Sequence, residues 1–180
     1  VGLRRIAYFT DFEAAGNDGW TNEYGGGTSN DHNDWQHDSP KGKGGDPSSA
    51  YSGNLVWGND IGNSGWNGLY QSNVNIRLIS PTIDCSNYSD LRLRFARWLT
   101  VESGQYDKAR VRVAGNIAWS NATNVDTIDT GWQTVDYDVS SFADGNPAVT
   151  MRWELRSDGG TEFGGWNVDD VMLYSLAASG

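Results

Sequence analysis

The sequence predicts an all-β protein whose fold is an antiparallel jelly-roll β-sandwich. Short runs in which apolar and polar residues alternate are separated by segments rich in Gly, Asn and Asp, a pattern typical of strands joined by turns. No amphipathic helical stretch of convincing length interrupts these runs. Several strands at regular spacing favour a sandwich or jelly roll.

Each expected strand is a run with a two-residue period that begins and ends near turn-forming residues. No internal repeat is visible, which argues against a repeat architecture. In chain order, the expected strands are Ile6–Glu13, Tyr51–Trp57, Tyr70–Ile79, Leu91–Val101, Lys108–Ala114, Trp132–Val139, Val149–Arg156 and Gly165–Tyr174.

The segment from Asn17 to Ser49 differs from the rest of the chain. It is rich in Gly, Asn, Asp and His, and it is too long for an ordinary connection in a compact domain. Its aromatic residues Trp20, Tyr24 and Trp35 predict a loop that packs on the sandwich.

Length and composition limit the domain organisation and the partners. The 180 residues show no linker-like division, so we expect one domain over residues 1–176 and a short tail at 177–180. The single cysteine, Cys85, excludes an internal disulfide and multi-cysteine metal sites. The net charge of −10 disfavours nucleic acid and anionic lipid surfaces and favours cations as small partners.

Hydropathy predicts no membrane insertion. No apolar run approaches the length of a bilayer, and the segment after Val1 lacks the charged and apolar regions of a signal peptide. We therefore expect a mature or excised piece of a larger, multidomain chain.

The stretch "GWNVDDVML" places Asp169 and Asp170 side by side in a predicted buried strand. Regular alternation would send the two carboxylates to opposite faces of the sheet. A carboxylate that faces the core is costly unless it is protonated, paired or bound to a cation. This pair is therefore the first candidate for a metal site.

A second group of acids lies near the other end of the chain. "TDFE" places Asp11 and Glu13 on one face of the first strand, and the first and last strands of a sandwich are commonly neighbours. Glu13 and Asp170 would then converge with a loop acid such as Asp46, and such oxygen ligands favour Ca²⁺ over Mg²⁺. The alternative is that these acids cap turns or pair with arginines, of which Arg4, Arg5 and Arg77 are candidates.

The order of several motifs resembles the MAM domain family, found in meprin, neuropilin and receptor phosphatase mu, with bacterial relatives in immune-inhibitor-A-type proteases and gingipain cleaved-adhesin modules. The motifs are "TDFE", "DGW", "GGDPSSAYSG", "LISPTID", "LRLRFARW", "WQTVDYDVSSF" and "GWNVDDVML", and they span about Phe9 to Tyr174.

The resemblance implies a jelly-roll sandwich without catalytic activity of its own and with a structural Ca²⁺ near the terminal strands. The matching positions are Glu13, Asp46, Asp169 and Asp170. The paired cysteines of animal members are missing, which favours a bacterial-type accessory domain over an animal-type adhesion domain.

Strand alternation also predicts a basic face. Apolar residues of three strands share the inward positions, which leaves the arginines outward. If these strands share a sheet, their guanidinium groups suit the carboxylates or sulfates of an acidic polysaccharide. The alternative is cross-strand pairing with acids such as Glu102 and Glu154. The outward residues proposed for the ligand are Arg92, Arg94, Trp98, Arg110, Arg112, Arg152 and Arg156.

Nine tryptophans are many for this length, and several lie in or near loops, where they either anchor the loop or stack on sugar rings. The favoured loop is "WGNDIGNSGWNGLY", in which Trp66 and Tyr70 would supply the flat faces for a ligand.

Signals for catalysis are weak. His32 and His37 lie in the polar stretch "NDHNDWQHD", whose spacing matches no zinc motif, and no nucleophile elbow, phosphate loop or HExxH is present. The stretch "RWELRSD" is similar to the arginine-bearing strand of jelly-roll alginate lyases, but the partner motifs of that family are absent. A polysaccharide lyase is therefore a minor alternative.

These observations predict a non-catalytic, calcium-stabilised, carbohydrate-binding accessory domain of a secreted or cell-surface bacterial enzyme or adhesin. The partner would be a polysaccharide, acidic in one hypothesis. The alternative is an adhesion domain that binds an extracellular protein, or a structural C-terminal domain of a secreted protease.

Overall fold

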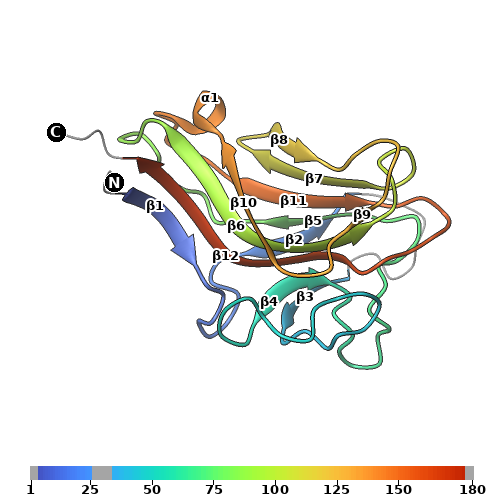
Figure 1. Cartoon of the computed structure of the whole chain (residues 1–180). Coiled ribbons are helices and arrows are strands. Elements are labelled where there is room, and N and C mark those ends of the chain that lie inside the picture. Colours follow the sequence, from blue (N-terminus) through green and yellow to red (C-terminus); the bar gives the residue numbers. More distant parts are fainter. Residues whose placement is uncertain (1–3, 26–33, 177–180) are drawn as a thin grey trace.

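The computed structural model describes residues 4–25 and 34–176, which form two antiparallel β-sheets packed face to face (Figure 1). The predicted fold class, an all-β sandwich, is confirmed. In the seven-stranded sheet the order is β10-β6-β12-β4-β3, and β1 pairs with β12 and β9 with β6; in the five-stranded sheet the order is β2-β5-β11-β7-β8.

The seven-stranded sheet contains β1 (Arg4–Thr10), β3 (Trp35–Asp38), β4 (Val56–Asn59), β6 (Leu91–Val101), β9 (Thr127–Ile128), β10 (Gln133–Asp138) and β12 (Gly165–Leu176). The five-stranded sheet contains β2 (Thr21–Tyr24), β5 (Asn75–Ile79), β7 (Lys108–Val113), β8 (Asn116–Ser120) and β11 (Met151–Arg156). A single helical turn, α1 (Ser140–Ala143), follows β10. No helix of the described residues is long and apolar enough to cross a membrane.

The core lies between the sheets and is built from alternate residues of the long strands. In β6, the inward side chains of Leu91, Leu93 and Phe95 are fully buried, as the alternation predicts. Trp153 of β11 lies in this core with its ring centroid 5.1 Å from that of Phe95 and 5.5 Å from that of Trp20. Trp20 thus packs the segment after β1 onto the sandwich, as predicted for this region.

All eight predicted strands overlap a strand of the structure, and the largest differences are at two strands that begin five residues later than predicted. The predicted strand Tyr51–Trp57 is reduced to β4 because the N–H groups of Tyr51 and Ser52 donate to the Asp169 carboxylate, not to a neighbouring strand. The predicted strand Tyr70–Ile79 is reduced to β5.

Four short strands were not predicted: β2, β3, β8 and β9. The region Asn17–Ser49, predicted as a loop, contains two of them. All four residues of β2 are exposed, and β2 and β8 form the edges of their sheet. An edge strand with little buried surface has no strong apolar alternation, so its sequence resembles a loop.

The prediction that Asp169 and Asp170 point to opposite faces is wrong. β12 contains a β-bulge between Asp169 and Met172, and Asp170 has a positive φ of 47°. Val168 and Val171 are therefore both in the core, although they are three residues apart. Both carboxylates lie on the outer face, where they bind the same residue, Ser52.

Replacing Trp153 tests the packing of the core. Trp153→Ala is expected to lower the free energy of unfolding by about 3–5 kcal/mol, because it leaves a large cavity between the sheets. Trp153→Phe is expected to cost less than half as much, because the buried indole N–H has no hydrogen-bond partner among the described residues. Urea unfolding measures both values. An equal cost for the two variants would contradict this account of the core.

Candidate functional site

The outer face of the five-stranded sheet carries the densest group of cations in the described structure. The outward side chains of β5, β11 and β7 are in register, and they form rows across the three strands. These rows are Asn75–Arg156–Lys108, Arg77–Glu154–Arg110 and Ile79–Arg152–Arg112.

All of these side chains except Ile79 line a groove of about 240 Å³, called here the basic groove. Its lining comprises one neutral residue, one acid and six cations: Asn75, Glu154, Arg77, Lys108, Arg110, Arg112, Arg152 and Arg156. The groove therefore has a large excess of positive charge, although the net charge of the protein is −10.

Ion pairs neutralise only part of this charge. Glu154 Oε1 lies 3.0 Å from Arg112 Nε and 3.2 Å from Arg152 Nε, so the predicted alternative of cross-strand pairing applies to these two arginines. Arg77 pairs with Glu23 of β2. Among the described residues, Lys108, Arg110 and Arg156 have no ion-pair partner.

Two pairs of like charges lie directly opposite each other: Arg152 beside Arg112 and Arg156 beside Lys108. Such pairs destabilise a sheet. Arg110 also has a buried Nε–H without a hydrogen-bond partner in the described structure. Stabilisation of the fold does not explain this arrangement of cations. The arrangement is suited to binding an anion with several charges.

The predicted single basic face is split between the two sheets. Arg92, Arg94 and Trp98 are on β6, in the seven-stranded sheet, and therefore lie on the opposite side of the sandwich from the basic groove. Alternation correctly separates inward from outward residues, but it does not specify the sheet to which a strand belongs.

On the seven-stranded sheet, the predicted ligand residues have other partners. Arg92 Nε donates to Asp136 at 2.6 Å, and Trp98 Nε1 donates to the carbonyl of Gly45 at 2.9 Å. Arg94 has no ion pair within the described structure, and it lines a separate pocket with Phe9, Tyr51 and Asp170 among its other residues. This second pocket is lined by fewer cations than the basic groove.

Glu13, Asp169 and Asp170 are brought together by the segment 51–55. Glu13 Oε1 accepts the N–H groups of Asn54 and Leu55 at 2.8 and 2.7 Å. Asp169 Oδ2 accepts those of Tyr51 and Ser52 at 3.0 and 3.1 Å. The first and last strands are neighbours, as predicted, but Glu13 lies beyond the end of β1, and the acids are linked only through hydrogen bonds to one loop.

None of these three acids forms an ion pair with Arg4, Arg5 or Arg77 in the described structure, so the turn-capping alternative holds and the arginine alternative does not. Both oxygens of Asp169 accept N–H groups, whereas the second oxygen of Glu13 and that of Asp170 accept none from the described residues. Burial raises the pKa of Asp169 to about 7.

Asp46 belongs to a different group. Its Oδ1 accepts a hydrogen bond from Asn167 Nδ2 at 2.7 Å, and burial raises its pKa to about 9, with further contributions from Asp60 and Asp34. These last two carboxylates are themselves buried, and sequence analysis did not identify them. Asp34 lies within the predicted loop Asn17–Ser49 and Asp60 just after a predicted strand, both in stretches that resemble ordinary polar loops.

A third acidic group combines Glu102, Asp107 and Asp158, whose carboxylate oxygens lie within 4.8 Å of one another. Asp107 is fully buried and accepts hydrogen bonds from Tyr70 Oη at 2.5 Å and from the Asp158 N–H at 2.8 Å. Sequence analysis did not identify this group because its members come from separate loops. Both oxygens of Asp107 accept hydrogen bonds, whereas the Glu102 carboxylate accepts none in the described structure.

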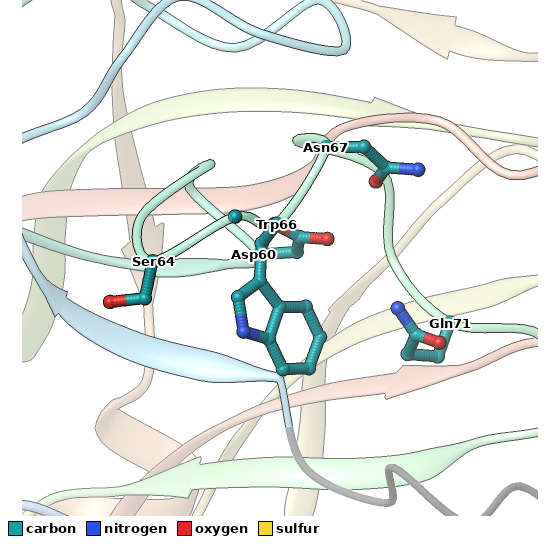
Figure 2. Close-up of a pocket in the computed structure, with 6 residues that line it drawn as sticks. Asp60, Ser64, Trp66, Asn67 and Gln71 are labelled. Carbon is teal, nitrogen blue, oxygen red and sulfur yellow. The ribbon is translucent and has the colours of Figure 1, made fainter.

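The loop after β4 forms a pocket of about 300 Å³, in which the Trp66 ring lies between Ser64 on one side and Gln71 and Asn67 on the other (Figure 2). Asp60 forms the remaining labelled wall. The prediction for Trp66 therefore stands as a candidate. Tyr70, in contrast, is only 1% exposed and bonds to Asp107, so it offers no face to a ligand.

The two histidines do not form a described catalytic pair. His37 is on β3, where its ring stacks on Trp57 at 5.2 Å and its Nε2 lies 2.9 Å from the Phe12 carbonyl oxygen. This environment indicates a packing role. His32 lies outside the described residues.

Comparison with known proteins supports the fold and a modular context. The chain is 27% identical over 172 residues to bacillopeptidase F of Bacillus subtilis; the match covers 95% of the chain but only 11% of that protein. No family model matches the chain, so the MAM resemblance stays a prediction.

Two solved structures share the fold. The K1 cleaved-adhesin domain of Lys-gingipain from Porphyromonas gingivalis W83 matches with a TM-score of 0.59 and 13% identity, over 98% of this chain and 100% of that one. A structure of carbohydrate-binding modules of the β-sandwich superfamily matches with a TM-score of 0.53 and 15% identity, over 91% of this chain and 60% of that one.

The hydrogen bonds of Asp169 can be tested separately from those of its neighbour. Asp169→Ala removes the acceptor of three backbone N–H groups and is expected to destabilise the protein by about 1.5–3 kcal/mol. Ser52→Ala removes only a hydroxyl bond to Asp170 and is expected to cost about 1 kcal/mol. Hydrogen exchange of the Tyr51 and Ser52 amides should accelerate in Asp169→Ala alone. Unchanged protection there would refute the proposed anchoring.

Proposed function

We propose that this chain is a non-catalytic accessory domain that binds an acidic polysaccharide through the basic groove. The observation that carries the proposal is the group of six cations around Glu154, which remains largely unneutralised in an acidic protein. Planar guanidinium groups bind carboxylates and sulfates through paired hydrogen bonds. Charges repeated along a polymer would match charges repeated across neighbouring strands.

The comparisons support the accessory role only at the level of fold and context. The structural relatives include adhesin and carbohydrate-binding modules, and the matched protease is far longer than this chain. We infer that the domain is part of a larger extracellular protein. An adhesion domain that binds an extracellular protein is the second candidate, supported by the cleaved-adhesin similarity.

The lyase alternative has less support. Glu154 Oε1 lies 3.0 Å from Arg112 Nε and 3.2 Å from Arg152 Nε, so this carboxylate is engaged in ion pairs within the groove. No histidine or tyrosine lines the basic groove in the described structure. The groove thus offers charge recognition without an evident acid and base at the same place.

Calcium enters the proposal at the terminal strands. Glu13 and Asp170 each retain one carboxylate oxygen without a partner in the described structure, and both acids bind the segment 52–55. These hard oxygen donors fit Ca²⁺, and the bound ion would stabilise the attachment of that segment to β12. Asp169 would support the site through its hydrogen bonds.

Electrophoresis through gels that contain polygalacturonate tests the glycan proposal. We expect Arg110→Gln combined with Arg156→Gln to weaken retention at least tenfold, because two of the unpaired cations are lost. The matched control is Arg92→Gln combined with Arg94→Gln, which removes the same charge from the opposite sheet and should leave most of the retention.

Two results would overturn the assignment to the basic groove: unchanged retention of the Arg110 and Arg156 variant, or equal loss in the control. Absence of wild-type retention on polygalacturonate, alginate and chondroitin sulfate would favour the adhesion alternative. Retention on neutral galactan that Trp66→Ala abolishes would instead assign binding to the pocket of Figure 2.

Thermal unfolding after removal of metal tests the calcium proposal. Ca²⁺ at one hundred times its Kd stabilises the native state by about 2.7 kcal/mol, which corresponds to a rise of a few degrees in Tm. Glu13→Gln combined with Asp170→Asn is expected to lose much of this gain. An identical gain in wild type and variant would exclude these two acids as ligands.

A further inference from the structure

Three buried oxygen atoms near β12 have no hydrogen-bond partner in the described structure: Asp46 Oδ2, Asp60 Oδ2 and Asn167 Oδ1. The side chains are 6%, 0% and 0% exposed, so bulk water does not solvate them. A buried polar oxygen without a partner costs about 1–3 kcal/mol, and a charged oxygen costs more. Three such atoms in neighbouring side chains require an explanation.

The surrounding contacts hold these side chains in place. The Asn167 amide donates to Asp46 Oδ1 at 2.7 Å, which directs its own oxygen into the same region. Asp60 Oδ1 accepts the N–H groups of Gly62 and Gly68 at 3.2 and 3.1 Å, which fixes the carboxylate and leaves its other oxygen free.

Gly58 allows β4 to pack closely against the Asn167 side chain. It lies opposite Asn167 of β12, and a Cβ added there would lie 2.8 Å from Asn167 Oδ1 and 2.5 Å from Ile61 Cγ2. An alanine at this position would push against the amide. The close packing thus fixes the position of the Asn167 side chain.

No ion pair in the described structure involves the three buried carboxylates, although the charge of Lys43 favours the ionised form of Asp60 and thus offsets part of their charge. Asp34 is also buried, but its two oxygens accept hydrogen bonds from Asn59 Nδ2 and the Gln71 N–H, so it contributes charge and not a free ligand atom. Lys43 Nζ donates to the carbonyls of Gly62 and Trp66. Burial and the neighbouring carboxylates raise the pKa of Asp46, as expected where negative charge is only partly compensated.

We propose that Asp46, Asp60 and Asn167 hold a divalent cation, Ca²⁺ by the chemistry of the ligands. Two carboxylates and an amide oxygen are hard donors of the kind that Ca²⁺ binds, whereas structural zinc sites use Cys and His. Two of the three buried carboxylates would then be ligands and the third a nearby charge. The site is separate from Glu13 and Asp170 and does not depend on glycan binding.

The ion would link three parts of the chain. Asp46 lies in the segment that covers the outer face of the seven-stranded sheet, Asp60 follows β4, and Asn167 is on β12. Asp60 also lines the pocket that contains Trp66, which gives the ion a route from solvent (Figure 2). Binding would therefore order the loop that forms this pocket.

Calcium titration calorimetry on metal-free protein tests the proposal, with Asp46→Asn combined with Asp60→Asn as the variant. Both changes preserve side-chain shape and remove buried charge. The variant is expected to bind one Ca²⁺ fewer per chain than wild type, and in EGTA its Tm should be higher than that of wild type. Asp84→Asn, at an exposed acid outside the three acidic groups, is the matched control and should retain the wild-type stoichiometry.

The same titration on Glu13→Gln combined with Asp170→Asn separates this site from the terminal-strand site, because the loop-site ion should remain. Tb³⁺ luminescence excited through tryptophan gives a second measurement and should fall in the Asp46 and Asp60 variant only. If that double variant does not fold, Asp60→Asn alone provides the same comparison. Equal Ca²⁺ stoichiometry in wild type and variant, or no Ca²⁺ bound by wild type, would overturn the proposal.

Discussion

Buried polar side chains on the outer face of β12 require hydrogen-bond partners, and this requirement determines which side of the sandwich is covered. Asn167 and Asp169 are fully buried although they point away from the core. The segment before β4 supplies their partners: Asp46 for the amide, and the N–H groups of Tyr51 and Ser52 for the carboxylate. One face of the seven-stranded sheet is therefore covered by its own chain.

None of the described segments forms such a cover over β5, β11 and β7 of the five-stranded sheet, so the basic groove is open in this part of the structure. The two sheets thus have different roles that follow from their outward residues. In the seven-stranded sheet, outward polar groups bind loops and stabilise the fold. In the five-stranded sheet, outward arginines repel one another across β11 and β7, which lowers stability and leaves charge for a ligand.

Sequence alternation predicted the long strands because each buries one face against the other sheet. Leu91, Leu93 and Phe95 illustrate this. It did not predict β2, which is exposed along its whole length, nor the bulge at Asp169 and Asp170, because a bulge depends on the register with β6.

The candidate sites show the same limit. Strand alternation identified four arginines as outward residues, and they line one groove in the structure: Arg110, Arg112, Arg152 and Arg156. Strand alternation also predicted Arg92 and Arg94 for the same face, although they are on the other sheet. The sequence of a strand does not specify which strands pair with it. Of the three buried acids Asp34, Asp46 and Asp60, only Asp46 was identified from the sequence, because the burial of a loop carboxylate depends on the tertiary structure.

The negative net charge of the protein affects which anions can bind in the basic groove. At about 0.15 M salt, charges more than about 8 Å apart are largely screened, whereas contacts within the groove are not. Any polyanion, an acidic polysaccharide included, is repelled by the acidic remainder of the surface, so binding requires contacts within the groove that outweigh this repulsion. Each Ca²⁺ bound at the proposed sites reduces the negative charge by two and stabilises the segment that covers the opposite sheet. Binding of Ca²⁺ would thus weaken the repulsion between the protein surface and an anionic ligand without occupying the groove. In this way the acidic loops would contribute to the proposed binding of an acidic polymer.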